Sequence, residues 1–226
     1  MITDVKKDEL LKRAGVKFLP FVGDFYEYGM SFDEEGNLVL GTKEKLGKKV
    51  LVLGEYHYCD EEISEEDMNS FTRDVISRYL EISSNGEKDR WMITFLKFER
   101  AFYNHVTEPS ETKKFWEHVM FYNYLQVPLH GPKMAGMAED YEEAIEPFFY
   151  LLQTYKPDCI IVWGNHLYYN IPNENGTQGE PLNFDETETW VYKIGENKVN
   201  VLPIHHPSTG FAWDIWHYSI VEFFRR

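Results

Sequence analysis

Three polar side chains that could do chemistry follow apolar runs that lie far apart in the chain. Glu55 and His206 each come two residues after such a run, and Asn123 directly follows another. A carboxylate can orient a water molecule and stabilise a positively charged sugar, and an imidazole can donate to a leaving base. A carboxamide can pair with both the N–H and the carbonyl of a pyrimidine. Together, these three groups suit hydrolysis of an N-glycosidic bond.

The apolar runs themselves predict buried parallel strands. They are rich in Val, Ile and Leu, are separated by helical patterns, and cover residues 49–53, 118–122, 159–163 and 200–204. Ligands of an open parallel sheet bind outside the carboxyl ends of its strands, so we expect the three polar side chains to converge on one crevice. The predicted fold class is α/β, as a three-layer αβα sandwich with a central, mainly parallel four-stranded sheet.

Helical patterns and turn residues predict the rest of the organisation. Helices are expected over residues 4–13, from 64 onward, and over 111–117, 138–155 and 211–224, with a hairpin over 189–194 and 198–204. Residues 165–188 contain several Pro and Gly residues, which predicts a long surface loop of the kind that often acts as a lid or binding segment. No repeat or linker divides the chain, so we expect a single domain over residues 1–226, with residues 1–47 as an N-terminal extension packed on it.

The composition favours a soluble globular protein. Of the 226 residues, 43% are hydrophobic and 16% are aromatic, which is enough for a large aromatic core. No apolar stretch approaches the length of a bilayer-spanning helix and the N-terminus has no signal-peptide pattern, so we expect no membrane partner and a cytoplasmic location. Cys59 and Cys159 cannot alone form a four-cysteine zinc or iron–sulfur site, so neither a metal nor another cofactor is expected.

The formal net charge of −15 restricts the choice of partner. DNA-binding surfaces are basic and gain affinity by releasing counterions, so this acidic chain could bind DNA only through a local patch of basic side chains or backbone N–H groups. The expected partner is therefore either DNA held by such a patch or a small molecule that contains a nucleobase.

Four motifs, taken in order, resemble those of the uracil-DNA glycosylase superfamily across most of residues 48–224. They are Gly54-Glu55-Tyr56-His57-Tyr58, Phe121-Tyr122-Asn123, Lys156-Pro157-Asp158 through Gly164, and His206-Pro207-Ser208. The resemblance implies that Glu55 activates water, that Asn123 reads the base and that His206 is the second catalytic residue. The implied activity is hydrolysis of the N-glycosidic bond of an unusual or damaged base.

The same resemblance assigns three further residues to substrate binding. Tyr58 matches a tyrosine that in one branch crowds the 5-position of the base, and Ser208 becomes a phosphate-contacting or loop-capping residue. Tyr56 stands where the best-known branch has its catalytic aspartate, and is expected to form part of the pocket wall. Only Glu55 matches an acid of the first motif, in the manner of the branch whose motif begins Gly-Glu.

Other interpretations of these residues remain open. The fold could serve as a non-catalytic module that binds a nucleobase, a nucleotide or a protein, or as a hydrolase of free nucleosides. Glu55, His57 and Cys59 alternate along the chain, so they would share one face of a continuing strand and, with His205 or His206, could hold zinc. In a purely structural interpretation, these polar residues cap segments or satisfy backbone groups of loops.

Overall fold

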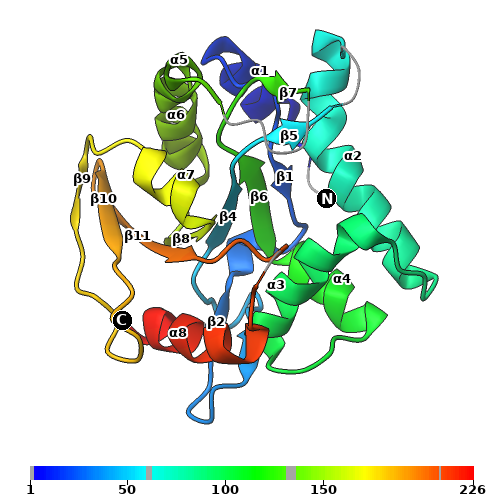
Figure 1. Cartoon of the computed structure of the whole chain (residues 1–226), viewed down its shortest axis with the longest axis vertical. Helices are drawn as coiled ribbons and strands as arrows, with labels where there is room; N and C mark the ends of the chain where they lie inside the picture. Colours follow the sequence, from blue (N-terminus) through cyan, green and yellow to red (C-terminus); the bar gives the residue numbers. More distant parts are fainter. Residues whose placement is uncertain (1–2, 60–62, 131–135, 209) are drawn as a thin grey trace.

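A seven-stranded mixed sheet forms the centre of the computed structural model, which describes residues 3–59, 63–130, 136–208 and 210–226 (Figure 1). Its strand order is β1-β6-β4-β8-β11-β10-β9. The strands are β1 (Phe21–Val22), β4 (Val50–Gly54), β6 (Val119–Asn123), β8 (Cys159–Trp163), β9 (Gly176–Gln178), β10 (Trp190–Ile194) and β11 (Asn197–Ile204). The pairs β4–β6, β4–β8 and β8–β11 are parallel, whereas β1–β6, β9–β10 and β10–β11 are antiparallel.

The α/β class expected from the sequence is confirmed, and the sheet has seven strands rather than four. The additional edge strands β1 and β9 have only two and three residues, too few to produce a recognisable alternation. The expected hairpin is present as β10 and β11. Two small two-stranded sheets lie beside the main one. The first pairs β2 (Met30–Phe32) with β3 (Leu38–Leu40), and the second pairs β5 (His57–Tyr58) with β7 (Pro128–Leu129).

Helices cover both faces of the main sheet, which explains why its inner strands are apolar throughout (Figure 1). The helices are α1 (Val5–Arg13), α2 (Glu65–Ser84), α3 (Ile93–Tyr103), α4 (Pro109–Glu117), α5 (Ala138–Glu143), α6 (Ile145–Tyr155), α7 (Asn165–Asn170) and α8 (Trp213–Arg225), with 3-10 turns at Tyr26–Tyr28 and Arg90–Met92. In β4, Leu51 and Leu53 face a core shared with α1, α5, α6 and α7, whereas Val50 and Val52 face a core shared with α2, α3, α4 and α8. No helix in the described part of the chain is both long and apolar enough to cross a membrane.

The helix expected over residues 138–155 is instead two helices, α5 and α6, separated at Ala144. Pro147 lies in the first turn of α6. A backbone N–H in the first turn has no acceptor within the helix, so a proline there costs no hydrogen bond. In a continuous helix the same proline would have left the carbonyl of Glu143 without its hydrogen bond. The proline therefore starts the second helix rather than bending one long helix.

The N-terminal extension is joined to the rest of the protein by a buried ion pair. Arg73 of α2 donates from Nη1 and Nη2 to the two carboxylate oxygens of Asp8, at 2.8 and 2.7 Å, and from Nε to the backbone oxygen of Pro20 at 3.0 Å. A bidentate pair of this kind fixes orientation as well as distance. It holds α1, α2 and the segment before β1 together.

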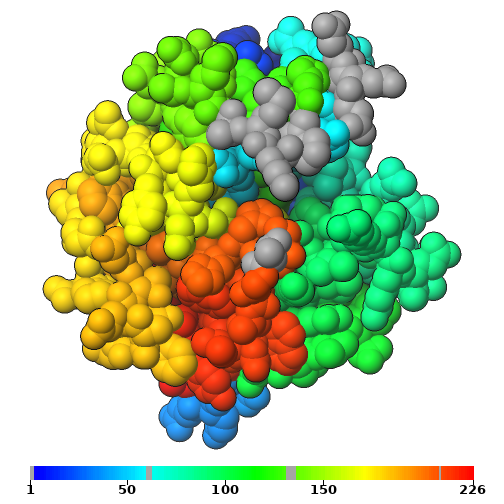
Figure 2. Space-filling model, viewed as in Figure 1, coloured from blue at the N-terminus to red at the C-terminus, as the bar shows by residue number. Residues whose placement is uncertain are grey.

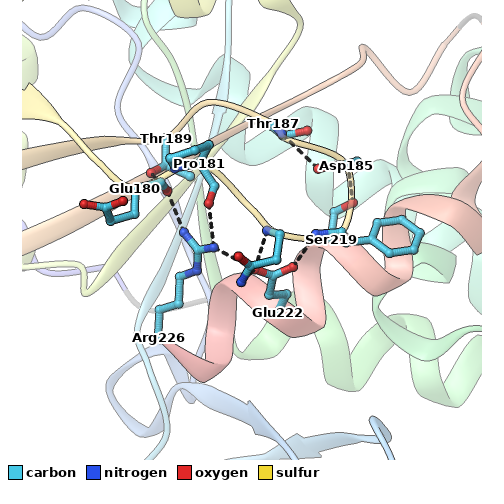
Figure 3. Close-up of polar contacts among 10 residues, drawn as sticks. Glu180, Pro181, Asp185, Thr187, Thr189, Ser219, Glu222 and Arg226 are labelled. Atoms are coloured by element: carbon cyan, nitrogen blue, oxygen red, sulfur yellow. Dashed lines mark hydrogen bonds and ion pairs between the residues drawn. The ribbon is translucent and has the colours of Figure 1, made fainter.

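Part of the segment expected as a long surface loop is hydrogen-bonded to the last helix, α8 (Figure 3). Glu222 accepts hydrogen bonds from the backbone N–H groups of Asn183 and Phe184 at 2.7 and 2.9 Å, and Ser219 donates to Asp185 at 2.6 Å. Residues 165–188 also contain α7 and β9. Residues 183–185 therefore lie against α8, because polar side chains on one face of that helix hold them.

Candidate functional site

The carboxyl ends of the parallel strands lie at one edge of the sheet. The register of β4 with β6 places Gly54 opposite Asn123, and the register of β8 with β11 places Trp163 opposite Ile204. Glu55 directly follows β4 and therefore lies next to Asn123, the last residue of β6. Figure 2 shows the neighbouring part of this edge, where α7 (yellow) lies next to the segment that follows β11 (orange). We call this edge of the sheet, with Glu55, Asn123 and His206, the strand-end site.

Glu55 is held by two side chains that come from separate helices. The hydroxyl group of Tyr141, in α5, donates to Oε1 of Glu55, and Nδ1 of His166, in α7, lies 2.7 Å from the same oxygen. Burial, followed by the hydrogen bond to Glu55, raises the pKa of Tyr141, so its hydroxyl keeps its proton and acts as the donor. The Glu55 side chain is 18% exposed, so it remains accessible from solvent.

The two oxygens of Glu55 have different surroundings. Oε1 has two partners, whereas Oε2 has no hydrogen bond within the described residues. An ionised carboxylate is only an acceptor and can take hydrogen bonds on both oxygens. Oε2 is therefore the oxygen that can accept a hydrogen bond from a water molecule.

His206 is held in one tautomer by the residue two positions later. The backbone N–H of Ser208 donates to Nδ1 of His206 at 3.2 Å, and Oγ of Ser208 lies 2.7 Å from the same nitrogen. His206 is exposed at the surface, and the protein atoms around its ring desolvate it only in part; this desolvation lowers its pKa, and the negative charge of Glu55 partly opposes the effect. The imidazole is therefore neutral at pH 7, and because Nδ1 is an acceptor its proton is assigned to Nε2. His206 presents an N–H donor at the strand-end site.

The end of β8 positions the His206 ring. Gly164 has a φ of +99°, and a Cβ atom at this position would lie 3.6 Å from the Cβ of His206. The ring of Trp163 meets the His206 ring edge to face, with centroids 6.0 Å apart. A Cβ atom at position 164 would make an ordinary contact with His206, but the positive φ would strain any residue other than glycine there.

Asn123 has a buried side chain whose amide is available to a ligand. The residue is 5% exposed, and no hydrogen bond to its side-chain amide is found within the described residues. Its Oδ1 would lie only 2.1 Å from a Cβ atom at position 54, so the glycine there makes room for the amide. Its amide atoms are not among the fully enclosed side-chain atoms of the described residues that lack a partner, so water or a ligand can reach them. Asn123 therefore offers one acceptor and two donors to a small molecule.

The three residues assigned to substrate binding by resemblance alone have different locations. Tyr56 is partly buried against the core that contains α5 to α7, and its pKa is raised by burial and then by the charge of Glu55. Ser208 contacts His206, as described above. Tyr58 lies in β5, outside the main sheet, with 44% of its surface exposed.

The zinc interpretation is wrong, because the structure separates its ligands. His57 is buried between the rings of Phe18 and Phe71, at centroid distances of 4.8 and 4.9 Å, and its Nε2 lies 2.8 Å from Oγ1 of Thr72. Within residues 3–59, 63–130, 136–208 and 210–226, no three His, Cys, Asp or Glu side chains are grouped as a metal site would require. His57 is a core residue, and Glu55 belongs to the strand-end site.

Burial of His57 is expected to make the fold sensitive to acid. Burial lowers the pKa of this imidazole to about 3, whereas the pKa in an unfolded chain is about 6.5. Between these values the unfolded chain binds a proton that the folded protein does not, so the free energy of unfolding falls as the pH decreases below about 6.5. Above that pH the histidine has no such effect. Between pH 7 and 4.5 this single group accounts for a loss of about 2–3 kcal/mol.

The double variant His57→Phe/Thr72→Val removes the ionisable ring and its hydrogen-bonding partner together. The free energy of unfolding of each protein is measured by urea titration at pH 7 and at pH 4.5. The decrease from pH 7 to pH 4.5 should be about 2–3 kcal/mol smaller in the variant than in the wild type. Equal losses in the two proteins would show that His57 does not stay neutral in the folded state.

Two residues of the site carry no motif in the sequence. His166 follows the apolar run of β8 by three residues, so the strand-end argument that selected Glu55 and His206 could have found it. Tyr141 lies in α5 and reaches Glu55 across 86 positions of the chain. Nothing in the local sequence distinguishes it from other core tyrosines.

No protein-family model matches this chain, and no curated protein matches it.

Proposed function

We propose that the strand-end site binds a nucleobase and hydrolyses its N-glycosidic bond, as the motifs that resemble the uracil-DNA glycosylase superfamily imply. One observation carries the proposal: a carboxylate with one oxygen available, an amide without a protein partner and a neutral imidazole lie at or just beyond the carboxyl ends of the parallel strands β4, β6 and β11. The parallel pairing of β6, β4, β8 and β11, with helices on both faces of the sheet, also supports the resemblance to this superfamily. That resemblance implies a three-layer αβα sandwich with a central, mainly parallel four-stranded sheet.

In the proposed reaction each of the three groups has one task. The amide of Asn123 pairs with the edge of the base, and Oε2 of Glu55 orients a water molecule toward the anomeric carbon of the sugar. As the bond from that carbon to the base nitrogen breaks, Glu55 stabilises the positive charge on the sugar. The Nε2–H of His206 donates to the carbonyl oxygen of the base, on which negative charge grows.

The reaction balances as a hydrolysis. The water oxygen bonds to the anomeric carbon as the bond from that carbon to the base nitrogen breaks, and one water proton passes to Glu55. Glu55 then releases this proton to solvent, and the departing base takes one up from solvent, so that the products are the sugar with a hydroxyl group and the neutral base. Tyr56 forms part of the pocket wall, and Ser208 keeps Nε2 of His206 protonated. Tyr58 would crowd the 5-position of a pyrimidine. If the base belongs to DNA, it must first leave the stack, at a cost of about a few kcal/mol.

A second candidate is a base-binding module without catalysis, and the formal net charge of −15 favours it. The same charge is a smaller obstacle to hydrolysis of a free nucleoside than to binding of a polyanion. All three candidates share recognition of a base by Asn123. They differ in whether the glycosidic bond breaks and in the size of the substrate.

Calorimetric titration with free uracil, hypoxanthine and xanthine tests the shared step. We expect the Asn123→Ala variant to bind the preferred base about 10- to 100-fold more weakly than the wild type, because one pair of hydrogen bonds is lost. Asn173→Ala, which removes an exposed amide elsewhere, should bind normally. Equal binding by wild type and Asn123→Ala would contradict the proposal that Asn123 recognises the base. Incubation with nucleosides and with oligonucleotides then separates the three candidates, since cleavage of nucleosides alone would identify a small-substrate hydrolase.

A further inference from the structure

We infer that Tyr141 and His166 are positioning residues of the strand-end site: they hold Oε1 of Glu55 from two helices and so reserve Oε2 for the attacking water. This inference rests on the proposed function for its catalytic consequence. The geometry on which it depends can be measured without any activity.

Tyr141 is built into the core and can therefore act as a fixed donor. It is 9% exposed, and its backbone oxygen accepts a hydrogen bond at 3.1 Å from the hydroxyl of Tyr124. Tyr124 is fully buried and directly follows Asn123, the residue proposed to read the base. The hydrogen bond from Tyr124 thus ties α5 to the chain next to Asn123, and the Tyr141 hydroxyl ties the same helix to Glu55.

His166 reaches the same oxygen from the solvent side. Its side chain is 60% exposed, yet Nδ1 lies 2.7 Å from Oε1 of Glu55. Its ring meets that of Tyr141 at a centroid distance of 6.2 Å and an interplanar angle of 68°. Because an ionised carboxylate is only an acceptor, Nδ1 of His166 must carry a proton. His166 and His206 therefore differ, since Nδ1 is the donor in one and the acceptor in the other.

Two donors on one oxygen restrict rotation of the carboxylate. With Oε1 fixed, Oε2 has a single orientation, which is the condition for a water molecule to be held in line with the bond that breaks. Loss of either donor leaves Glu55 charged and near the substrate but free to turn. The expected defect is therefore in the rate of the chemical step rather than in binding of the base, which Asn123 provides.

The first test is the protonation of the imidazole nitrogens, observed by long-range 1H–15N NMR. We expect a proton on Nδ1 of His166 in the wild type and its transfer to Nε2 in Glu55→Ala, while His206 keeps its proton on Nε2 in the wild type. His105, an exposed histidine whose Nε2 lies 3.0 Å from Glu111, is the matched control and should be unaffected by Glu55→Ala. A His166 ring without a proton on Nδ1, or one unchanged in Glu55→Ala, would overturn the inference whether or not the protein is an enzyme.

The second test separates kcat from KM. Tyr141→Phe and His166→Ala should each lower kcat for base release about 10- to 100-fold with little change in KM. His166→Asn should recover much of the loss, because an Asn amide N–H can replace the donor at Nδ1. His105→Ala should leave both constants unchanged. A normal kcat in Tyr141→Phe and His166→Ala would overturn the inference. If the wild type releases no base, the proposed function fails while the NMR result still decides the geometry.

Discussion

The Glu55→Gln variant is expected to release base about 10³-fold more slowly than the wild type, within the 10²–10⁴-fold range that positioned acids and bases contribute. Its fold should be unchanged, because the amide oxygen can still accept hydrogen bonds from Tyr141 and His166. What the substitution removes is the negative charge that orients the water molecule and stabilises the sugar in the transition state.

The measurement compares initial rates of base release with urea unfolding of the same samples. Glu111→Gln is the matched control, since Glu111 is also a carboxylate in contact with a histidine, His105, but outside the strand-end site. It should release base at the wild-type rate. An active Glu55→Gln variant, or an equal loss in Glu111→Gln, would remove Glu55 from the mechanism.

The largest effect on stability is expected from Glu99→Ala. Glu99 is fully buried in α3, and four side-chain groups donate hydrogen bonds to its two oxygens. The donors are Tyr79 at 3.0 Å, Thr107 at 2.5 Å, Thr112 at 2.6 Å and Trp116 at 3.1 Å. Burial raises the pKa of Glu99, and the hydrogen bonds oppose this rise. The carboxylate thus joins α2, α3 and α4 within an aromatic core.

Truncation of Glu99 leaves these donors without an acceptor in a region largely closed to water. Each unsatisfied buried group costs about 1–3 kcal/mol, so we expect a loss of about 4 kcal/mol or more in the free energy of unfolding. The Glu99→Gln variant keeps the shape of the side chain and one acceptor oxygen. Its free energy of unfolding should therefore decrease by about half as much as that of Glu99→Ala. Urea unfolding followed by tryptophan fluorescence measures both values. A loss below about 1 kcal/mol in Glu99→Ala would mean that the four hydrogen bonds contribute little net stability.

The main features of the fold were readable from the sequence because they depend on short-range patterns. Continuous apolar runs predicted the strands, and polar residues just beyond them predicted the edge at which Glu55, Asn123 and His206 lie. The helix expected from residue 64 onward begins there, because Oγ of Ser64 accepts a hydrogen bond from the backbone N–H of Asp67 in the first turn of α2.

Other features depend on contacts between distant segments, and local patterns do not predict them. Tyr141 reaches Glu55 across 86 positions, and Glu222 binds the backbone of residues 183–184 from 38 or 39 positions away. The spacing of Glu55, His57 and Cys59 suggested a shared face, but the aromatic pair Phe18 and Phe71 draws the His57 ring into the core.

The central claim is that Glu55 and His206 cleave an N-glycosidic bond, and the most direct test is base release from labelled oligonucleotides. Single- and double-stranded substrates, each with one uracil, hypoxanthine or xanthine, are incubated at low salt with wild type or with the Glu55→Gln/His206→Ala variant. We expect abasic sites with the wild type alone. Equal release by both proteins would place the chemistry elsewhere. Absence of release from every oligonucleotide and every nucleoside, at high protein concentration, would contradict hydrolysis and leave base binding as the function of the site.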